Sequence, residues 1–160
     1  MRTSFICAAV LGRLKNNMPT IHFEIVTPEK VVLKEEVQQI TVPTKMGEIT
    51  VLPNHIPLVA GLMPGVLEIK TADNKTETIA VSGGFIEVLP DKVVILADTA
   101  ERAGDIDEAR AEEARKRAET LMAEKREDVD FSVVQAKIAK ELARVKAVRR
   151  HRSRHIIKTD

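Results

Sequence analysis

The chain has 160 residues, of which 44% are hydrophobic and 31% charged, as is typical of a folded globular protein rather than a disordered chain. With four Phe and neither Trp nor Tyr, it lacks the aromatic faces on which single-stranded nucleic acids stack. A single cysteine excludes a disulfide framework and favours a reducing compartment, and no Cys/His cluster has the spacing of a zinc site, so no metal is expected.

The net charge of +1 conceals an uneven distribution. Residues 1–106 carry ten Lys or Arg and thirteen Asp or Glu, a net charge of −3. Residues 131–160 carry nine Lys or Arg and two acidic residues, a net charge of +7. An acidic body with a basic end indicates that the last segment has an anionic partner.

The first 17 residues have the pattern of an N-terminal extension that is not part of the fold. A short apolar run from Phe5 to Gly12 is followed by Gly-Arg-Leu-Lys, which lacks the small residues of a signal-peptide cleavage site. An upstream extension, with Met18 as the true start, is therefore favoured over a signal peptide. No apolar run approaches the ~20 residues of a membrane-spanning helix.

Residues 20–97 have the pattern of an all-β domain. Ile21, Phe23 and Ile25 alternate with polar residues, which is the period of a half-buried strand. Short apolar runs follow, and turn signals recur about every ten residues, which predicts a β-sandwich or barrel. After the first, the expected strands are residues 31–33, 37–42, 49–52, 58–60, 66–70, 77–82, 86–89 and 93–97.

The centre of this half is residues 47–65, GEITVLPNHIPLVAGLMPG, in which Pro-Asn-His-Ile-Pro separates two apolar runs. Proline fixes φ and Asn54 tolerates the left-handed region, so we expect a shaped loop at one end of the sandwich. The adjacent Gly83 and Gly84 predict a bulge or a close backbone approach.

A hinge is expected at residues 98–104, because the strand pattern ends at Ala97 and the period then becomes helical. Asp105 with Glu108 has the spacing of a helix start with its capping partner. The first helix is expected from Asp107 to about Lys125, and residues 128–130 form a turn. A second helix, starting near residues 131–132, should fold back on the first as a hairpin.

The apolar stripes of these two helices are unequal. The first helix offers mainly alanines, each of which buries about one methyl group, roughly 0.8 kcal/mol. Such a weak seam predicts a hairpin that must dock on another surface and can undock from it. The stripes are Ala111, Ala114, Ala118 and Leu121 on the first helix, and Val134, Ile138, Leu142, Val145 and Val148 on the second.

Residues 106–111, IDEARA, are the sharpest motif in the chain. Asp107 and Arg110 are three residues apart beside a helix N-terminus, whose free N–H groups favour anions. From these residues alone, a capped helix with a surface ion pair worth less than about 1 kcal/mol is the better interpretation. His22 and His55 have no carboxylate or cysteine at a useful spacing, and no catalytic constellation is present.

Several separate motifs, in the same order, resemble the epsilon subunit of F-type ATP synthases between Met18 and about Val148. They are Ile21-His22 with Val26-Thr27-Pro28, Gly47-Glu48-Ile49, residues 52–58 (LPNHIPL), Pro64-Gly65, residues 82–88 (SGGFIEV), Ala97-Asp98-Thr99-Ala100, the helix motif at 106–111, and residues 128–131 (DVDF). The resemblance implies a β-sandwich stalk domain (18–104), a regulatory helical hairpin (105–152) and a basic tail (153–160).

The family implies a non-catalytic rotor subunit that couples c-ring rotation to ATP synthesis. Its sandwich would bind the gamma subunit and the c-ring, with Glu48 and His55 as the candidate ring contacts. Its hairpin would be compact when permissive, and extended into the alpha/beta catalytic head when it inhibits ATP hydrolysis. The family also implies a peripheral position on the cytoplasmic face of the bacterial plasma membrane, with only indirect contact with the membrane.

Some bacterial epsilon subunits bind ATP through an Ile/Leu-Asp-x-x-Arg-Ala signature, so the resemblance makes ATP a candidate regulatory ligand, although no cofactor is required. One family arginine is replaced here by Lys140, which keeps the charge but loses the bidentate fork. The candidate nucleotide-binding residues are Glu101, Ile106, Asp107, Arg110, Ala111, Arg117, Lys140 and Arg144.

The basic second helix leaves an alternative open. A free-standing adaptor could use these charges to bind nucleic acid through phosphates, independently of sequence. In the epsilon family an extended second helix instead meets an acidic segment of the catalytic subunits. The stalk interpretation, without a nucleic-acid partner, is preferred.

Overall fold

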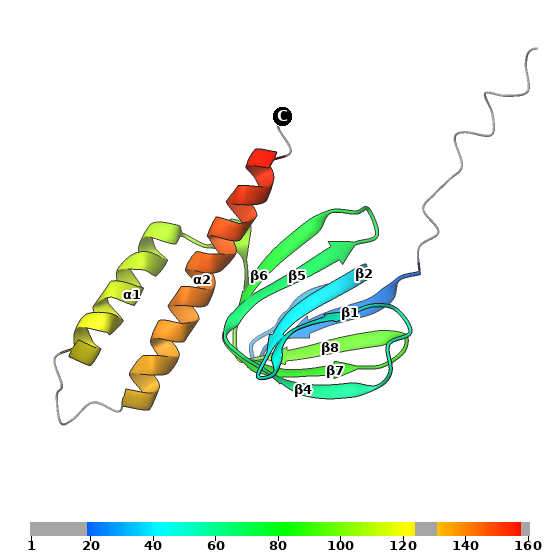
Figure 1. Cartoon of the computed structure of the whole chain (residues 1–160), viewed down its shortest axis with the longest axis horizontal. Helices are drawn as coiled ribbons and strands as arrows, with labels where there is room; N and C mark the ends of the chain where they lie inside the picture. The colour runs from blue at the N-terminus through cyan, green and yellow to red at the C-terminus, as the bar shows by residue number, and fades with distance from the viewer. Residues whose placement is uncertain (1–18, 124–130, 158–160) are drawn as a thin grey trace, which may run out of the picture.

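The structure is a computed structural model that describes residues 19–123 and 131–157. Within them, nine strands precede two α-helices. Figure 1 shows the strands gathered into one body with the two helices side by side next to it. The strands are β1 (Ile21–Val26), β2 (Val31–Thr44), β3 (Gly47–Val51), β4 (Leu58–Leu62), β5 (Gly65–Thr71), β6 (Thr76–Val81), β7 (Gly84–Val88), β8 (Lys92–Ala97) and β9 (Ala100–Arg102). A 3₁₀ turn, η1 (Ala103–Asp105), leads to α1 (Glu108–Ala123), and α2 (Phe131–Ile157) follows. The expected β-sandwich followed by a helical hairpin is confirmed.

The long strand β2 joins the two layers of the sandwich. Its first half pairs with β1, which continues into β8, β7 and β4. Its second half pairs with β3 and with β5. Strand β5 in turn pairs with β6, and β6 pairs with β9. The register against β5 shifts between Val37 and Gln39, where β2 passes from one layer to the other. A bulge bends a strand in this way. The sequence pattern predicted two separate strands at 31–33 and 37–42, whereas the structure has the single strand β2.

The core between the layers consists of the inward residues of nearly every strand. Alternation places residues such as Phe23, Leu67 and Ile95 inside, each no more than 1% exposed. This cluster contains no residue of either helix. The sandwich therefore has a core that does not depend on the hairpin.

The turn at Asn54 and the close approach at the paired glycines follow the sequence expectations, and a second asparagine turn lies at Asn74. Asn54 and Asn74 have φ of 63° and 59°, the left-handed conformation that asparagine tolerates. Gly84 has φ of 127°, and a Cβ built there would lie 2.0 Å from the carbonyl oxygen of Leu96 on β8. Only glycine allows β7 and β8 to approach so closely.

The expected hinge at 98–104 is wrong in its details. Strand β9 pairs with β6 through Ala100–Arg102, and η1 follows directly. The sheet therefore holds the backbone as far as Arg102, and Gly104 lies outside it, in η1. The short polar sequence Ala-Glu-Arg gives no strand signal, because its pairing is decided by β6.

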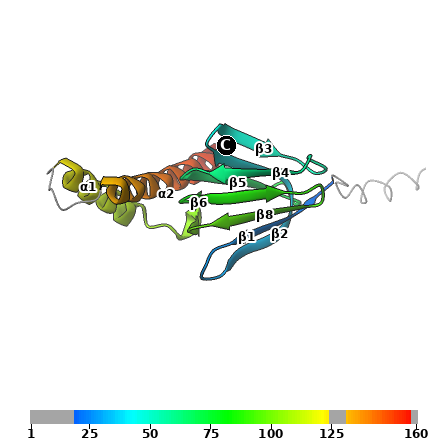
Figure 2. The ribbon, with the colours of Figure 1, turned by 90° about the horizontal axis from the view of Figure 1, so that it is seen from below.

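The hairpin lies against the outer face of β5 and β6, with α2 between α1 and the sheet (Figures 1 and 2). A second apolar cluster fills this interface, formed by Val66, Ala80, Ala103, Ile106, Ala111, Val145, Ala147 and Val148. Helix α2 continues to Ile157, into the segment expected to be a tail beyond residue 152. The N-terminal extension at 1–17 and the turn at 128–130 lie outside the described residues.

Candidate functional site

Asp107 begins α1 as its N-cap residue. Its side-chain Oδ1 accepts a hydrogen bond from the backbone N–H of Arg110 at 3.2 Å, and its carbonyl accepts from the N–H of Ala111 at 3.0 Å. The expected cap at Asp105 is wrong, since Asp105 ends η1. Asp107 therefore contacts the backbone of Arg110, and this contact satisfies one of the free N–H groups of the helix start.

Two residues of the signature have a packing role. Ile106 is 8% exposed and Ala111 is fully buried, and both belong to the cluster between the hairpin and the sheet. An alanine at position 111 leaves room for α2 to approach α1. The apolar members of the motif thus fix where α1 starts relative to the sandwich.

Arg144 on α2 joins the hairpin to β9. Its Nη2 and Nε lie 2.8 Å and 3.0 Å from Oε2 of Glu101, and its Nη1 lies 3.1 Å from Oε2 of Glu141 one turn earlier. Burial by itself lowers the pKa of Arg144, but the charges and hydrogen bonds of Glu101 and Glu141 raise that pKa above its ordinary value. The guanidinium is therefore a fixed cation with two carboxylate partners.

The other candidate cations lie farther toward solvent. Arg117 pairs with Glu113 on its own helix at 3.2 Å, with both side chains about 70% exposed. Arg110 is exposed, and Lys140 is half-buried one turn before Arg144. The structure thus brings together Glu101 with Arg144, and Ile106 with Ala111, while Arg117 lies on the exposed surface of α1.

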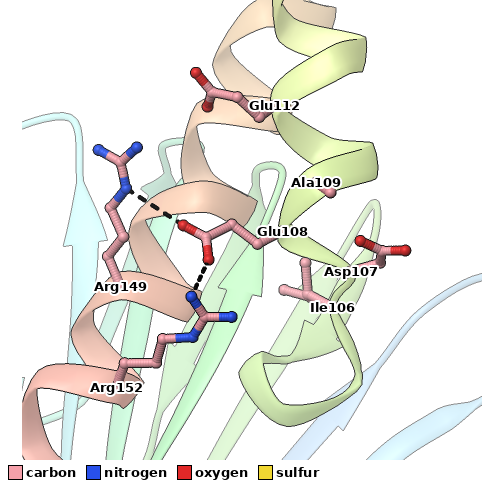
Figure 3. Close-up of a pocket in the computed structure, with 7 residues that line it drawn as sticks. All are labelled: Ile106, Asp107, Glu108, Ala109, Glu112, Arg149 and Arg152. Carbon is pink, nitrogen blue, oxygen red and sulfur yellow. Dashed lines mark ion pairs between the residues drawn. The ribbon is translucent and has the colours of Figure 1, made fainter.

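An open pocket of about 510 Å³ lies between the start of α1 and the last turns of α2 (Figure 3). Of the candidate residues, only Ile106 and Asp107 line it. Arg149 and Arg152 reach across from α2 to the carboxylate of Glu108, and Arg149 Nε lies 3.6 Å from Glu108 Oε1. The two arginines at this pocket already share a carboxylate partner.

The sequence reasoning missed a second contact of α2, which holds its end to the sandwich. Arg154 Nη2 donates a hydrogen bond to Glu68 Oε2 on β5 at 2.7 Å, and Arg150 Nε lies 2.7 Å from Glu68 Oε1. The basic run was visible as a helix face, but nothing in the local pattern points to Glu68 as its partner. Only the docking of α2 on β5 reveals the pair.

The two candidate ring contacts lie in and just after the edge strand β3, which pairs with β2 alone among the described strands. Glu48 is near its start, with a side chain 56% exposed and 3.7 Å from Arg150 Nη1. His55 follows its end and is exposed, with Nδ1 2.7 Å from the carbonyl oxygen of Ile56. The two residues therefore lie toward opposite ends of one exposed strand.

Among the described residues, no group of three or more His, Cys, Asp or Glu side chains is placed to hold a metal ion. None of the described helices is long and apolar enough to cross a membrane.

Two family models cover most of the chain. The ATP synthase Delta/Epsilon chain beta-sandwich domain matches residues 20–103, and the long alpha-helix domain of the same chain matches residues 105–149. The ATP synthase epsilon chain of Chloroflexus aggregans is 49% identical over 82% of this chain and 94% of its own length. That of Alkalilimnicola ehrlichii is 40% identical over 86% of this chain and 98% of its own length.

Two solved structures that resemble this chain are also from ATP synthases. A chain of the Euglena gracilis mitochondrial ATP synthase (OSCP/F1/c-ring in rotational state 1) matches with a TM-score of 0.63 and 31% identity, covering 78% of each chain. A chain of the Tetrahymena thermophila central stalk and c-ring structure matches with a TM-score of 0.53 and 16% identity, covering 83% of this chain and 96% of that chain, a likeness of fold.

A β-sandwich carrying a helical hairpin, with both domain models in order, defines the delta/epsilon class of ATP synthase chains. The chain belongs to the ATP synthase epsilon-chain family and is a non-catalytic subunit of the central stalk. This assignment replaces the alternative of a free-standing nucleic-acid adaptor.

Proposed function

We propose that the sandwich binds the gamma subunit and the c-ring and transmits rotation between them, and that the hairpin restrains ATP hydrolysis. The observation that carries this proposal is the contrast between the outer faces of the two layers. The β5–β6 face is covered by α2, whereas the β4–β7–β8 face carries exposed apolar side chains. A rotor subunit needs such a free apolar face for a permanent partner.

The free face has an apolar row on two strands and a further exposed apolar side chain on the next strand. Phe85 on β7 is directly opposite Leu96 on β8, and they are 62% and 57% exposed. Val59 on β4 is 70% exposed, with Gly61, two residues on, opposite Phe85. Large side chains left in water at this density are typical of an interface, and gamma is the partner proposed for it.

The c-ring contact is proposed along β3, because an edge strand with unpaired backbone groups and exposed flanks can meet a second surface over its whole length. Met46 and Ile56, beyond either end of β3, are 96% and 76% exposed. With Glu48 and His55 they form a strip of mixed charge and apolar surface. This arrangement would hold the subunit peripherally at the cytoplasmic face of the bacterial membrane, through the ring.

ATP is proposed as a regulatory ligand of the hairpin. Its phosphates would contact Arg144 beside Glu101, and Asp107 and Arg110 would contribute from the start of α1. Binding there would favour the compact hairpin, because Arg144 and Arg110 come from different helices. In the undocked state, the basic face of α2 would meet the acidic segment of the catalytic head.

Crosslinking in assembled enzyme tests the ring contact. With Cys7→Ser as background, Glu48→Cys and His55→Cys should each crosslink to a cysteine in the polar loop of the c subunit. Asp73→Cys, in the exposed β5–β6 turn, is the matched control and should not crosslink. Crosslinks from position 73 without any from 48 or 55 contradict the proposed orientation.

The gamma contact has its own test. Replacing Phe85 and Leu96 together by serine should weaken co-sedimentation with gamma, because it removes the exposed apolar row. Val133→Ser removes a side chain of similar exposure, 51%, from α2 and should leave this binding unchanged. If the unsubstituted chain, the Phe85 and Leu96 double variant and Val133→Ser all bind gamma equally, the β4–β7–β8 face is excluded as the gamma surface.

A further inference from the structure

The last turns of α2 present two separate rows of side chains. Ala143, Ala147, Arg150 and Arg154 follow one another in steps of four, three and four, so they lie on one side of the helix. This row faces the sandwich, because Arg150 and Arg154 end on Glu68 of β5.

The second row has steps of four and three and faces the other way. It consists of Val145, Arg149 and Arg152, and its arginines end on Glu108 of α1. The end of α2 therefore holds two carboxylates with two arginines each, one on the sheet and one within the hairpin. Of these two carboxylates, Glu68 is the one that joins the hairpin to the sandwich.

Glu68 is placed to hold α2 strongly. It lies two residues after Val66 on the outer face of β5, beside the apolar cluster under α2, and its side chain is only 14% exposed. Both of its oxygens face an arginine at 2.7 Å. The side chains of Arg150 and Arg154 are 43% and 42% exposed, so the contacts are shielded on the Glu68 side and remain sensitive to salt.

We propose that Glu68, with Arg150 and Arg154, forms an ionic latch that keeps α2 docked on the sandwich and sets how readily the hairpin leaves it. Arg150 and Arg154 lie beyond residue 149, where the match to the helical domain model ends. Arg150 also approaches Glu48 at 3.7 Å. Under the proposed function, Glu48 would meet both the ring and Arg150, so ring docking would influence the latch.

The alternative is that docking rests on the apolar cluster and on the contact of Arg144 with Glu101, with Arg150 and Arg154 as solvated surface charges. The two accounts differ in what one carboxylate does. If the latch holds α2, removing the charge of Glu68 releases the helix. Removing the charge of Glu108, which lies on α1 and also has two arginine partners on α2, does not release it.

Thiol labelling of the full chain measures this release without any other subunit, so its outcome is independent of the proposed function. With Cys7→Ser as background, Ala147→Cys places a thiol in the row that faces the sheet, where Ala147 is fully buried. Its labelling rate reports the fraction of molecules in which α2 has left the sandwich.

In this reporter, Glu68→Gln should raise the labelling rate about tenfold at low salt. The double variant Arg150→Gln/Arg154→Gln should raise the labelling rate by a similar factor. Glu108→Gln is the matched control, because it removes a carboxylate that also has two arginine partners, but in the row facing α1. It should change the rate less than about twofold.

Salt gives a second readout. At about 1 M salt, where the screening length is about 3 Å, the parent reporter and Glu68→Gln should label at similar rates. A rise of less than threefold in Glu68→Gln at low salt, or a rise equal to that of Glu108→Gln, overturns the latch. Circular dichroism of each variant checks that the sandwich remains folded during labelling.

Discussion

Arg144 and Glu101 are 43 residues apart in sequence, yet the guanidinium of Arg144 donates to Glu101 Oε2 from Nε at 3.0 Å, with Nη2 at 2.8 Å. The pair links α2 to β9, the strand that directly precedes the hairpin. Glu101 is thus one of the points where sandwich and hairpin meet, and a ligand that contacts Arg144 acts at this junction.

Breaking this junction should destabilise the docked hairpin. Arg144→Gln leaves Glu101 and Glu141 without their cation, and we expect a loss of about 1–2 kcal/mol in the free energy of unfolding by denaturant. Arg117→Gln, which breaks an exposed pair, should cost about 0.5 kcal/mol or less. A smaller loss for Arg144→Gln than for Arg117→Gln would show that the contact with Glu101 adds nothing.

The N-cap makes a second prediction. Asp107→Ala removes the acceptor for the N–H of Arg110 and should destabilise the hairpin by about 1 kcal/mol. Asp105→Ala, two residues earlier at the end of η1, removes the same charge without a cap and should have a smaller effect. Thermal unfolding followed at the helical circular dichroism band compares the two, and equal losses argue against Asp107 as the cap.

Gly84 tests the close approach of β7 to β8. Gly84→Ala places a Cβ about 2.0 Å from the carbonyl oxygen of Leu96 at a positive φ, and should cost about 3 kcal/mol or more. Gly104→Ala has nothing within 4 Å of its new Cβ and should change the stability by less than about 1 kcal/mol. Denaturant titration of both variants checks the difference, and similar midpoints would contradict it.

ATP should stabilise the isolated chain. A ligand that binds only the compact hairpin, at a hundred times its dissociation constant, adds about 2.7 kcal/mol. We therefore expect a higher melting temperature with millimolar ATP, no gain in Arg110→Ala, and tighter binding in Lys140→Arg, because arginine restores the bidentate fork. Calorimetry that detects neither heat nor a melting shift with ATP leaves the 106–111 motif as a helix cap.

Truncation after Gly104 separates the two domains. It keeps β9 and the whole core between the layers, so the shortened chain should fold and assemble with the stalk. ATP hydrolysis by the assembled head complex should rise if the hairpin restrains it. Hydrolysis equal to that with the full chain would remove the inhibitory role and keep the stalk assignment.

The sequence by itself determined the two-part architecture. Alternation with a period of two, as in Ile21, Phe23 and Ile25, depends only on neighbouring residues in the chain and predicts a strand directly. The helical stripe from Val134 to Val148 is local in the same sense. The conformations of Asn54 and Gly84 were also predictable, because the backbone of these residue types is chosen by their own sterics.

Tertiary structure alone decided the distant partners of the charged side chains. Strand β9 exists because β6 offers it an edge, and β2 is one strand because a bulge carries it between the layers. The partners of Arg144 and Arg154, Glu101 and Glu68, are 43 and 86 residues away. An ion pair needs two side chains at one point in space, and for residues so far apart only the packing of α2 on the sandwich brings them there.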